Sequence, residues 1–380
     1  RGAGRPEAIF ALERSMDNAA RQLGVDAYAL RRKSFIKPEQ FPYQTAISDT
    51  YDVGEFDALL SAAELNADRA GFAARKAASQ AAGKLRGEGL CYYIESILGD
   101  KTENSRVVFE DDGTVSLYVG TQSNGQGHET VYASFLADHS GIPVEAIRII
   151  QGDSDLIATG GGTGGSRSVT MQSGATLQTV GTIVERFSAY LGEKFDARDV
   201  EFDDERFRLS GSNETPTMLE VAEMARADGR SDLLDIQEQF RLSDRSFPNG
   251  AHIAEVEIDP ETGQVTVDRY SVTDDFGNMI NPMLAEGQVH GGVAQGVGQA
   301  LSEHVVYDED GQLLTATFMD YGMPRASDLP MIDFATRPVP STYNPMGMKG
   351  CGEAGSVGAL AAIAYAMADA LSARGGEDIQ

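Results

Sequence analysis

Two stretches of this chain carry the pattern of a β-hairpin, and helical segments surround both of them. Residues 107–119 contain two short runs rich in apolar and β-branched residues on either side of an Asp-Asp-Gly turn. Residues 254–270 alternate apolar and acidic side chains before an Asp-Pro-Glu-Thr-Gly turn and then continue into a second apolar run. Hairpins interleaved with helices favour an α+β fold with mixed sheets.

The spacing of apolar residues predicts helices along most of the chain. The first covers residues 6–23, with Pro6 in its first turn and Gly24 directly after its end. Further helices are expected at residues 56–85, 128–140, 286–301 and 356–371, and a strand is expected at 146–151. The acidic and weakly patterned residues 191–243 are interpreted as a surface elaboration. The two halves that each pair a hairpin with helices hint at an old duplication.

Length and charge limit the organisation and the partners of the chain. With 380 residues it is roughly 2.5 times the usual size of one domain, which predicts two domains. A net charge of −27 repels a nucleic-acid backbone and argues against sequence-independent binding of nucleic acid. Its 2 cysteines cannot supply the four thiolates that an iron–sulfur cluster usually needs. No membrane span is expected, since no stretch reaches roughly 20 apolar residues, and residues 359–368 are predicted to form a buried helix.

Three glycine-rich segments, residues 120–130, 160–168 and 349–355, each lead into a predicted helix. Glycine lets a ligand approach the backbone closely, and the free N–H groups at a helix start attract anions. None of the segments ends in the Gly-Lys-Ser/Thr of a nucleotide triphosphatase loop, and none is a dinucleotide fingerprint. The pattern favours a large anionic ligand held mostly by backbone groups. Flexible surface turns are the alternative.

Glu353 is the candidate catalytic residue of the third segment. It follows Gly352 at a helix start and has no local partner for an ion pair other than Lys349. Such a carboxylate could act as a general base, or it could simply complement the helix dipole. The predicted helix at 286–301 carries four glycines in its interior, which indicates a close neighbour, either backbone or cofactor. The 5 histidines show no paired spacing typical of metal ligands, so a zinc site is not expected.

Taken together, seven motifs resemble the molybdenum-binding large subunit of the xanthine dehydrogenase / aldehyde oxidase / carbon monoxide dehydrogenase family. They lie at residues 1–8, 125–130, 164–168, 274–282, 287–292, 320–324 and 349–353. The resemblance implies a fold of α+β class, the molybdenum cofactor-binding domain of the xanthine dehydrogenase type. Residues 1–86 would be the C-terminal tail of a first molybdopterin-binding domain, and residues 87–380 would be the second.

The resemblance also implies the cofactors and their contacts. The chain would bind a molybdenum–molybdopterin cofactor, in the cytosine dinucleotide form, without a side-chain ligand to the metal. The residues expected to contact this cofactor are Arg1, Gly2, Ala3, Gln126, Gly127, His128, Thr130, Ser166, Arg167, Ser168, Gln288, Lys349, Gly350, Cys351 and Gly352. The [2Fe–2S] clusters and the FAD would belong to a small and a medium partner subunit.

By the same resemblance Glu353 is the catalytic base in the hydroxylation of an aldehyde or an N-heterocycle, in a cytoplasmic enzyme. Two departures matter. Residues 1–5 contain no cysteine, so the copper-linked site of carbon monoxide dehydrogenases proper is not expected. The N-terminal part of the family's large subunit has no counterpart, so the chain is expected to be a fragment or a split subunit that is inactive alone. The alternatives are a non-catalytic protein that binds or inserts the cofactor, a structural subunit with an empty site, and a carbon monoxide dehydrogenase-like subunit of unknown substrate.

Overall fold

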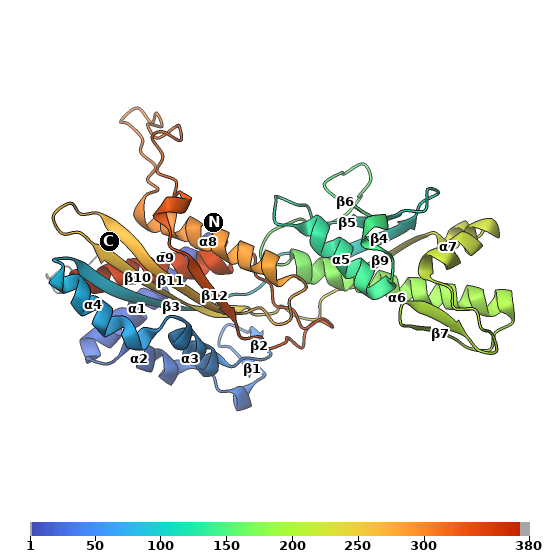
Figure 1. Cartoon of the computed structure of the whole chain (residues 1–380), viewed down its shortest axis with the longest axis horizontal. Helices are drawn as coiled ribbons and strands as arrows, with labels where there is room; N and C mark the ends of the chain where they lie inside the picture. The colour runs from blue at the N-terminus through green and yellow to red at the C-terminus, as the bar shows by residue number, and fades with distance from the viewer. Residues whose placement is uncertain (1, 373–380) are drawn as a thin grey trace. The chain divides into compact units, whose positions relative to one another are not determined.

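The computed structural model describes residues 2–372, and these form two compact units (Figure 1). Unit 1 consists of residues 2–97, 246–342 and 347–372, and unit 2 consists of residues 98–245 and 343–346. The predicted domain boundary between residues 86 and 87 does not separate these units. It falls inside strand β3 (Leu85–Ile94), which pairs with β10 (Asn249–Ile258) along its whole length. The assignment of residues 1–86 and 87–380 to two family domains stays a prediction.

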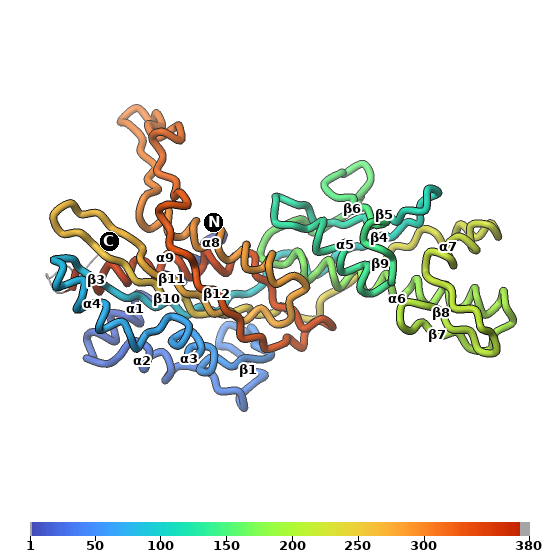
Figure 2. The backbone as a smooth tube through the Cα atoms, viewed as in Figure 1, coloured from blue at the N-terminus to red at the C-terminus, as the bar shows by residue number. Residues whose placement is uncertain are grey.

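Unit 1 is built on a four-stranded sheet with the order β12-β11-β10-β3 (Figure 2). Strand β10 is antiparallel to both β3 and β11 (Val265–Asp275), and β11 is parallel to β12 (Ile332–Thr336). Its two faces carry separate apolar cores: Cys91 and Tyr93 of β3 face one core, and Leu90 and Tyr92 face the other. Ala254, Val256 and Ile258 of β10 all belong to the first of these cores, which confirms the predicted alternation in residues 254–258.

Helices cover both faces of this sheet. Helix α9 (Ala354–Ser372) packs on β3 and β10, and both α8 (Pro282–Leu301) and α1 (Arg5–Leu23) pack on α9. Helix α3 (Phe56–Asn66) contacts β10 and β11, and α4 (Phe72–Ala81) contacts β3. The remaining elements of unit 1 are α2 (Ala27–Ser34), η1 (Gly2–Gly4), η2 (Pro38–Gln40), η3 (Arg69–Gly71), η6 (Ala326–Asp328), β1 (Tyr43–Gln44) and β2 (Thr50–Tyr51).

Glycines in β3 explain why α9 can lie directly on the sheet. A Cβ atom at Gly89 would stand 2.0 Å from the carbonyl oxygen of Ala362. Helix α9 is the one described helix that is long and apolar enough, by length and composition, to cross a membrane. In its most apolar window, however, 78% is buried inside the structure. The predicted buried helix at 359–368 is therefore confirmed, as part of the main core of unit 1.

Unit 2 repeats the pairing pattern of unit 1. Its sheet has the order β6-β5-β4-β9, in which β4 (Thr102–Phe109) is antiparallel to both neighbours. Strand β5 (Val115–Val119) is parallel to the edge strand β6 (Ile147–Ile150). Each sheet thus contains a hairpin with one antiparallel and one parallel edge strand. This shared pattern supports the hinted duplication.

The other elements of unit 2 are α5 (His128–Ser140), α6 (Ser168–Phe195), α7 (Met218–Ala227), η4 (Val144–Ala146), η5 (Ser231–Leu233), β7 (Val200–Asp203), β8 (Arg206–Leu209) and β9 (Asp235–Arg241). The prediction that residues 191–243 are a surface elaboration is wrong for two parts of this segment. Strand β9 pairs with β4 over seven residue pairs and buries Ile236, and Phe207 of β8 is also fully buried.

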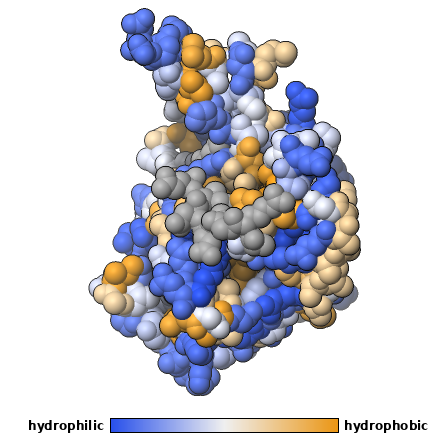
Figure 3. Space-filling model, turned by 90° about the vertical axis from the view of Figure 1, so that its left-hand side faces the viewer, coloured by the Kyte–Doolittle hydropathy of each residue, from blue (hydrophilic) through white to orange (hydrophobic). Residues whose placement is uncertain are grey.

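The predicted helix at 56–85 is also wrong in its middle. Helices α3 and α4 are separated because Asp68 adopts a left-handed backbone with φ 49°, and η3 follows. The other predicted helices and strands are confirmed, and α2 and α7 are helices that the sequence did not predict. The face of the molecule in Figure 3 is mostly hydrophilic, in keeping with the net charge of −27.

Candidate functional site

Glu353 stands at the start of α9 and is held there by an ion pair. Nη1 of Arg5 donates a hydrogen bond of 2.6 Å to its Oε2 atom, and 16% of each side chain is exposed. The carbonyl oxygen of Glu353 accepts from the backbone N–H groups of Ser356 and Val357, so the residue belongs to the first turn of the helix. Its carboxylate is therefore fixed by both its backbone and its side chain.

Arg5 connects this carboxylate to a second one. Its Nη1 atom also lies 3.0 Å from Oε1 of Glu95, whose side chain is fully buried, and its Nη2 atom donates to the carbonyl oxygen of Ser96 at 2.7 Å. The sequence offered only Lys349 as a partner for Glu353, and this is corrected. Arg5 is 348 residues away in sequence and was missed as a functional residue. The signal available was its position inside the motif at residues 1–8.

Lys349 instead fixes the loop that leads to Glu353. Its side chain is fully buried, and its Nζ atom lies 2.5 Å from Oδ2 of Asp275. The other carboxylate oxygen of Asp275 accepts from the backbone N–H groups of Gly277 and Val339, each at 2.9 Å. The Lys349 ammonium is thus directed into the protein, and a cofactor contact by this residue, which stays a prediction, would be made by its backbone.

The rest of this loop combines a left-handed turn with a shielded thiol. Gly350 has a φ of 88°, which favours glycine. Burial raises the pKa of the Cys351 thiol to about 12, so the thiol is neutral near pH 7. Gly352 is exposed. Backbone groups of residues 350–352 are the part of the loop that a ligand could contact.

The glycines of α8 bring this helix against the start of α9. A Cβ atom at Gly292 would stand 2.7 Å from the backbone nitrogen of Ser356, and one at Gly296 would stand 2.5 Å from Cβ of Ala359. The sequence predicts that either backbone or cofactor lies close to the glycines of α8. At Gly292 and Gly296 the close neighbour is the protein itself, in helix α9. Gly296 follows Gly292 by four residues and Ala359 follows Ser356 by three, so the helices run parallel here. One turn before Gly292 in α8 is the half-buried Gln288, and one turn before Ser356 are Gly352 and Glu353.

The segment before α1 also lies against the first turn of α9. Gly2, Ala3 and Gly4 all have positive φ, at 72°, 49° and 89°. A Cβ atom at Gly2 would lie 3.4 Å from Oγ of Ser356, in the first turn of α9. The expected cofactor residue Gly2 therefore lies against the first turn of α9, and Ala3 follows it in sequence, whereas Arg1 is outside the described residues.

In unit 2, two glycine-rich loops are joined to one another. The backbone nitrogen of Gly162 donates to the carbonyl oxygen of Gly120, and Thr163 exchanges two hydrogen bonds with the backbone of Gln122. Gly160 lies so close to Gly120 that a Cβ atom there would stand 2.4 Å from the Gly120 carbonyl oxygen. The two helices that follow, α5 and α6, both begin without a side-chain cap. Their free N–H groups suit an anion.

The expected residues of the first loop form a small polar group. Gln126 accepts a hydrogen bond from the backbone N–H of Asn124 through Oε1 and donates through Nε2 to Nε2 of His128, at 3.0 Å. His128 thus carries its proton on Nδ1, a buried atom with no hydrogen-bond partner among the described residues. Burial lowers the pKa of His128, which keeps the ring neutral. Gly127 has a φ of 83°, and Thr130 is exposed in the first turn of α5.

In the second loop the arginine has a structural role. The Arg167 guanidinium donates to Oε2 of Glu103 at 3.0 Å and to three backbone carbonyl oxygens, and the residue is 2% exposed. A cofactor contact by Arg167 stays a prediction, and it would be made by the backbone. Ser166 has a left-handed backbone with φ 57°, and Ser168 opens α6.

These residues fit a ligand with phosphate groups. Unit 2 supplies two uncapped helix starts and an unpartnered buried N–H, and unit 1 supplies a glycine loop beside a fixed carboxylate. Within residues 2–372 there is no group of three or more His, Cys, Asp or Glu side chains that could hold a metal ion. The convergence of Gln126, Ser166, Gln288 and Glu353 on one cofactor stays a prediction.

Comparisons with known proteins also indicate a cofactor-binding chain. A family model described as a molybdopterin cofactor-binding domain matches residues 63–330, and a second with the same description matches residues 1–35. The chain is similar to the carbon monoxide dehydrogenase large chain of Afipia carboxidovorans, with 33% identity over 96% of this chain and 48% of that protein. It is also similar to the nicotine 6-hydroxylase large subunit of Paenarthrobacter nicotinovorans, with 32% identity over 98% of this chain and 48% of that protein.

Solved structures are similar along almost the whole chain. Carbon monoxide dehydrogenase from Oligotropha carboxidovorans superposes with a TM-score of 0.89 and 31% identity, over 97% of this chain and 49% of that one. Quinoline 2-oxidoreductase from Pseudomonas putida 86 gives a TM-score of 0.88 and 32% identity, over 96% and 49%. The chain thus spans about half the length of the relatives it matches.

Proposed function

The chain belongs to the family of molybdopterin cofactor-binding large subunits that includes xanthine and carbon monoxide dehydrogenases, and from this premise we propose that it supplies the catalytic base of a molybdenum hydroxylase. The observation that carries the proposal is the placement of Glu353. Its carboxylate is fixed at a helix start, paired with Arg5 and flanked by a glycine loop that Lys349 anchors.

Residues of both units are proposed to contact the cofactor. The glycine loops and uncapped helices of unit 2 would bind the phosphates through N–H groups, in a cytosine dinucleotide form of molybdopterin. Gln126 would orient His128, whose Nδ1–H is available as a donor. In unit 1, Gln288 and the backbone of residues 349–352, together with Gly2 and Ala3, would bind the pterin end.

When bound, the molybdenum cofactor supplies a two-electron oxidant and the oxygen that is transferred to the substrate. The role of this chain is to handle the proton. Glu353 would accept this proton on its carboxylate, and the 2.6 Å hydrogen bond from Arg5 would orient the carboxylate and stabilise its negative charge. The proposed substrates are aldehydes or N-heterocycles, and the proposed electron acceptors are [2Fe–2S] and FAD centres of a small and a medium subunit in a cytoplasmic complex. The remaining half of the large subunit would be joined to this chain or supplied as a split partner.

The experiment is Glu353→Gln in the assembled complex, with the exposed Glu309→Gln as the matched control. Glu353→Gln should leave the molybdenum content near normal and lower turnover by about 10²–10⁴-fold, and Glu309→Gln should change neither. Retained turnover in Glu353→Gln would refute its assignment as the base.

The same preparation separates the alternatives. A protein that only binds or inserts the cofactor would contain pterin but show no reduction of molybdenum by substrate. A structural subunit would assemble fully without molybdenum. Reduction of the wild-type complex by one member of a panel of aldehydes, purines and pyridines would support the hydroxylase and identify its substrate class.

A further inference from the structure

Arg5 is shared between two carboxylates, and only one of them is the proposed base. Its Nη1 atom lies 2.6 Å from Oε2 of Glu353 and 3.0 Å from Oε1 of Glu95. The Glu353 side chain is 16% exposed, whereas the Glu95 side chain is fully buried. One nitrogen atom of Arg5 therefore lies between a carboxylate that solvent reaches and a carboxylate that it does not reach.

The backbone of Glu95 is fixed by the sheet of unit 1. Its N–H group donates to the carbonyl oxygen of Pro248 at 2.8 Å, which continues the antiparallel pairing of β3 with β10 beyond the ends of both strands. The next residue, Ser96, accepts a hydrogen bond of 2.7 Å from Nη2 of Arg5 through its carbonyl oxygen. The guanidinium is thus held by a side chain and a backbone group of the same segment, and that segment is an extension of the sheet.

The charge of Glu353 changes in the proposed reaction, and the inference below rests on that proposed function. While Glu353 is ionised, the guanidinium of Arg5 has an anion on both sides. Once Glu353 has accepted a proton, its hydrogen bond from Arg5 weakens, because the acceptor no longer carries a charge. A largely buried guanidinium is costly to leave without an anion. Glu95 supplies that anion whether Glu353 is protonated or not.

We propose that Glu95 is a positioning residue, which holds Arg5 in place while the charge of Glu353 changes. Arg5 then presents the same donor to Glu353 after each proton transfer as before it, and the base returns to one orientation. Glu95 acts through Arg5 and takes no part in the proton transfer itself. Its removal should therefore affect the mobility of the guanidinium first and turnover as a consequence.

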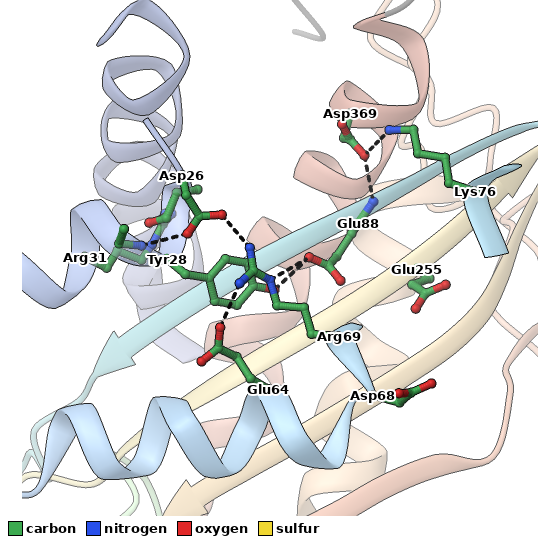
Figure 4. A network of polar contacts seen from close by, with 12 residues as sticks. Asp26, Tyr28, Arg31, Glu64, Asp68, Arg69, Lys76, Glu88, Glu255 and Asp369 are labelled. Atoms are coloured by element: carbon green, nitrogen blue, oxygen red, sulfur yellow. Dashed lines mark hydrogen bonds and ion pairs between the residues drawn. The ribbon is translucent and has the colours of Figure 1, made fainter. Parts of the chain in front are cut away.

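A second shared arginine in unit 1 provides a matched control. Arg69 pairs with Asp26 at 2.5 Å and with Glu64 at 2.8 Å, and both carboxylates point toward it in Figure 4. None of these three residues belongs to the candidate site. Glu64→Gln removes one of two carboxylates from a shared arginine, as Glu95→Gln does, so it measures the general cost of such a change.

The first experiment measures how fast phenylglyoxal modifies Arg5 in the 380-residue chain without cofactor, by mass spectrometry of the peptide that contains it. In Glu95→Gln the rate should rise by about tenfold over wild type, because one charge-assisted hydrogen bond to the guanidinium is weakened. Glu64→Gln should leave the rate at Arg5 unchanged. Glu95→Asp keeps the charge on a shorter side chain and should give an intermediate rate, and it serves as the test variant if Glu95→Gln does not fold. A wild-type rate in the Glu95 variants overturns the proposal.

The second experiment measures steady-state kinetics and molybdenum content of the assembled complex. Glu95→Gln should lower kcat by about tenfold with KM and molybdenum content unchanged, and Glu64→Gln should change none of the three. The double variant Arg5→Gln/Glu95→Gln should be no slower than Arg5→Gln alone, since Glu95 acts through Arg5. Additive losses in the double variant, an unchanged kcat in Glu95→Gln, or a loss of molybdenum from it would overturn the proposal. The modification of Arg5 needs neither molybdenum nor turnover, so its result stands apart from the test of Glu353.

Discussion

The guanidinium of Arg5 donates a 2.6 Å hydrogen bond to the carboxylate of Glu353, although 348 residues separate the two in sequence. The same guanidinium reaches the buried Glu95 and the carbonyl oxygen of Ser96. Arg5 is therefore held from three directions, and it can hold the carboxylate of Glu353 in one orientation. In the proposed enzyme this makes Arg5 a positioning residue for the base.

Replacing Arg5 should consequently affect turnover more than substrate binding. In the assembled complex, Arg5→Gln should lower kcat by about 10–100-fold with little change in KM, because the base is misplaced while the substrate pocket stays intact. Arg5→Lys keeps the positive charge and should restore part of the loss. Steady-state kinetics of both variants, with molybdenum content measured in parallel, checks this. A purely structural role would instead lower the molybdenum content and leave Lys no better than Gln.

The buried pair of Lys349 and Asp275 should dominate the stability of the loop before α9. Lys349→Met leaves the Asp275 carboxylate buried without its cation and should lower the free energy of unfolding of unit 1 by about 3–5 kcal/mol. Adding Asp275→Asn removes that charge and should recover part of the loss. Urea unfolding of the single and double variants measures both effects. Equal stability of Lys349→Met and wild type would contradict the role given to the pair.

Close packing between α8 and α9 should make Gly355 intolerant of a side chain. A Cβ atom there would stand 2.3 Å from the carbonyl oxygen of Val289, so Gly355→Ala should destabilise the protein by about 1–3 kcal/mol. Gly287 lies on the partner helix α8, with open space around its Cβ position. Gly287→Ala should be neutral or stabilising by up to about 1 kcal/mol. Thermal unfolding of the two variants compares the sites directly.

Glu88 should make the stability of unit 1 depend on pH. Burial raises its pKa from 4.5 to about 7 in the folded protein. The folded state thus holds the proton more tightly, and this contribution is fully present below about pH 4.5 and is lost as the pH rises through about 7. Glu88→Gln should therefore be more stable than wild type at pH 8, by on the order of 1–3 kcal/mol, with the difference closing towards pH 4.5. Urea unfolding at several pH values would show a constant difference if Glu88 titrates normally.

Much of the fold could be predicted from the sequence because its signals are local. Helix α5 begins and ends as expected, since Gly127 and Gly141 supply left-handed residues at its two ends. The break between α3 and α4 could not be predicted in this way. Asp68 is left-handed there, and its carboxylate accepts from Arg75, which also binds Glu255 of β10. The direction of α4 is thus set by a contact with a strand far along the chain.

The candidate site also has features that local sequence signals predict and features that depend on distant contacts. The glycine loops and helix starts at Gln126, Ser166 and Lys349 follow from short motifs, because glycine and a helix start determine what a backbone can bind. The ion pairs within the site do not follow from short motifs. Lys349 is only four residues from Glu353 in sequence but pairs with Asp275, and it is Arg5 that pairs with Glu353. Which cation meets which carboxylate depends on the packing of α1, α8 and α9, which no single motif encodes.

The pairing of β3 with β10 has a consequence for synthesis on the ribosome. Strand β3 ends at Ile94, and its partner begins only at Asn249, with residues 98–245 of unit 2 translated in between. At about 5–20 residues per second, β3 would wait roughly 8–30 s for the strand that covers its edge. During that interval its apolar residues are a natural target for a chaperone, while unit 2 can already fold. The nascent chain would therefore complete its inserted unit first and close the surrounding one last.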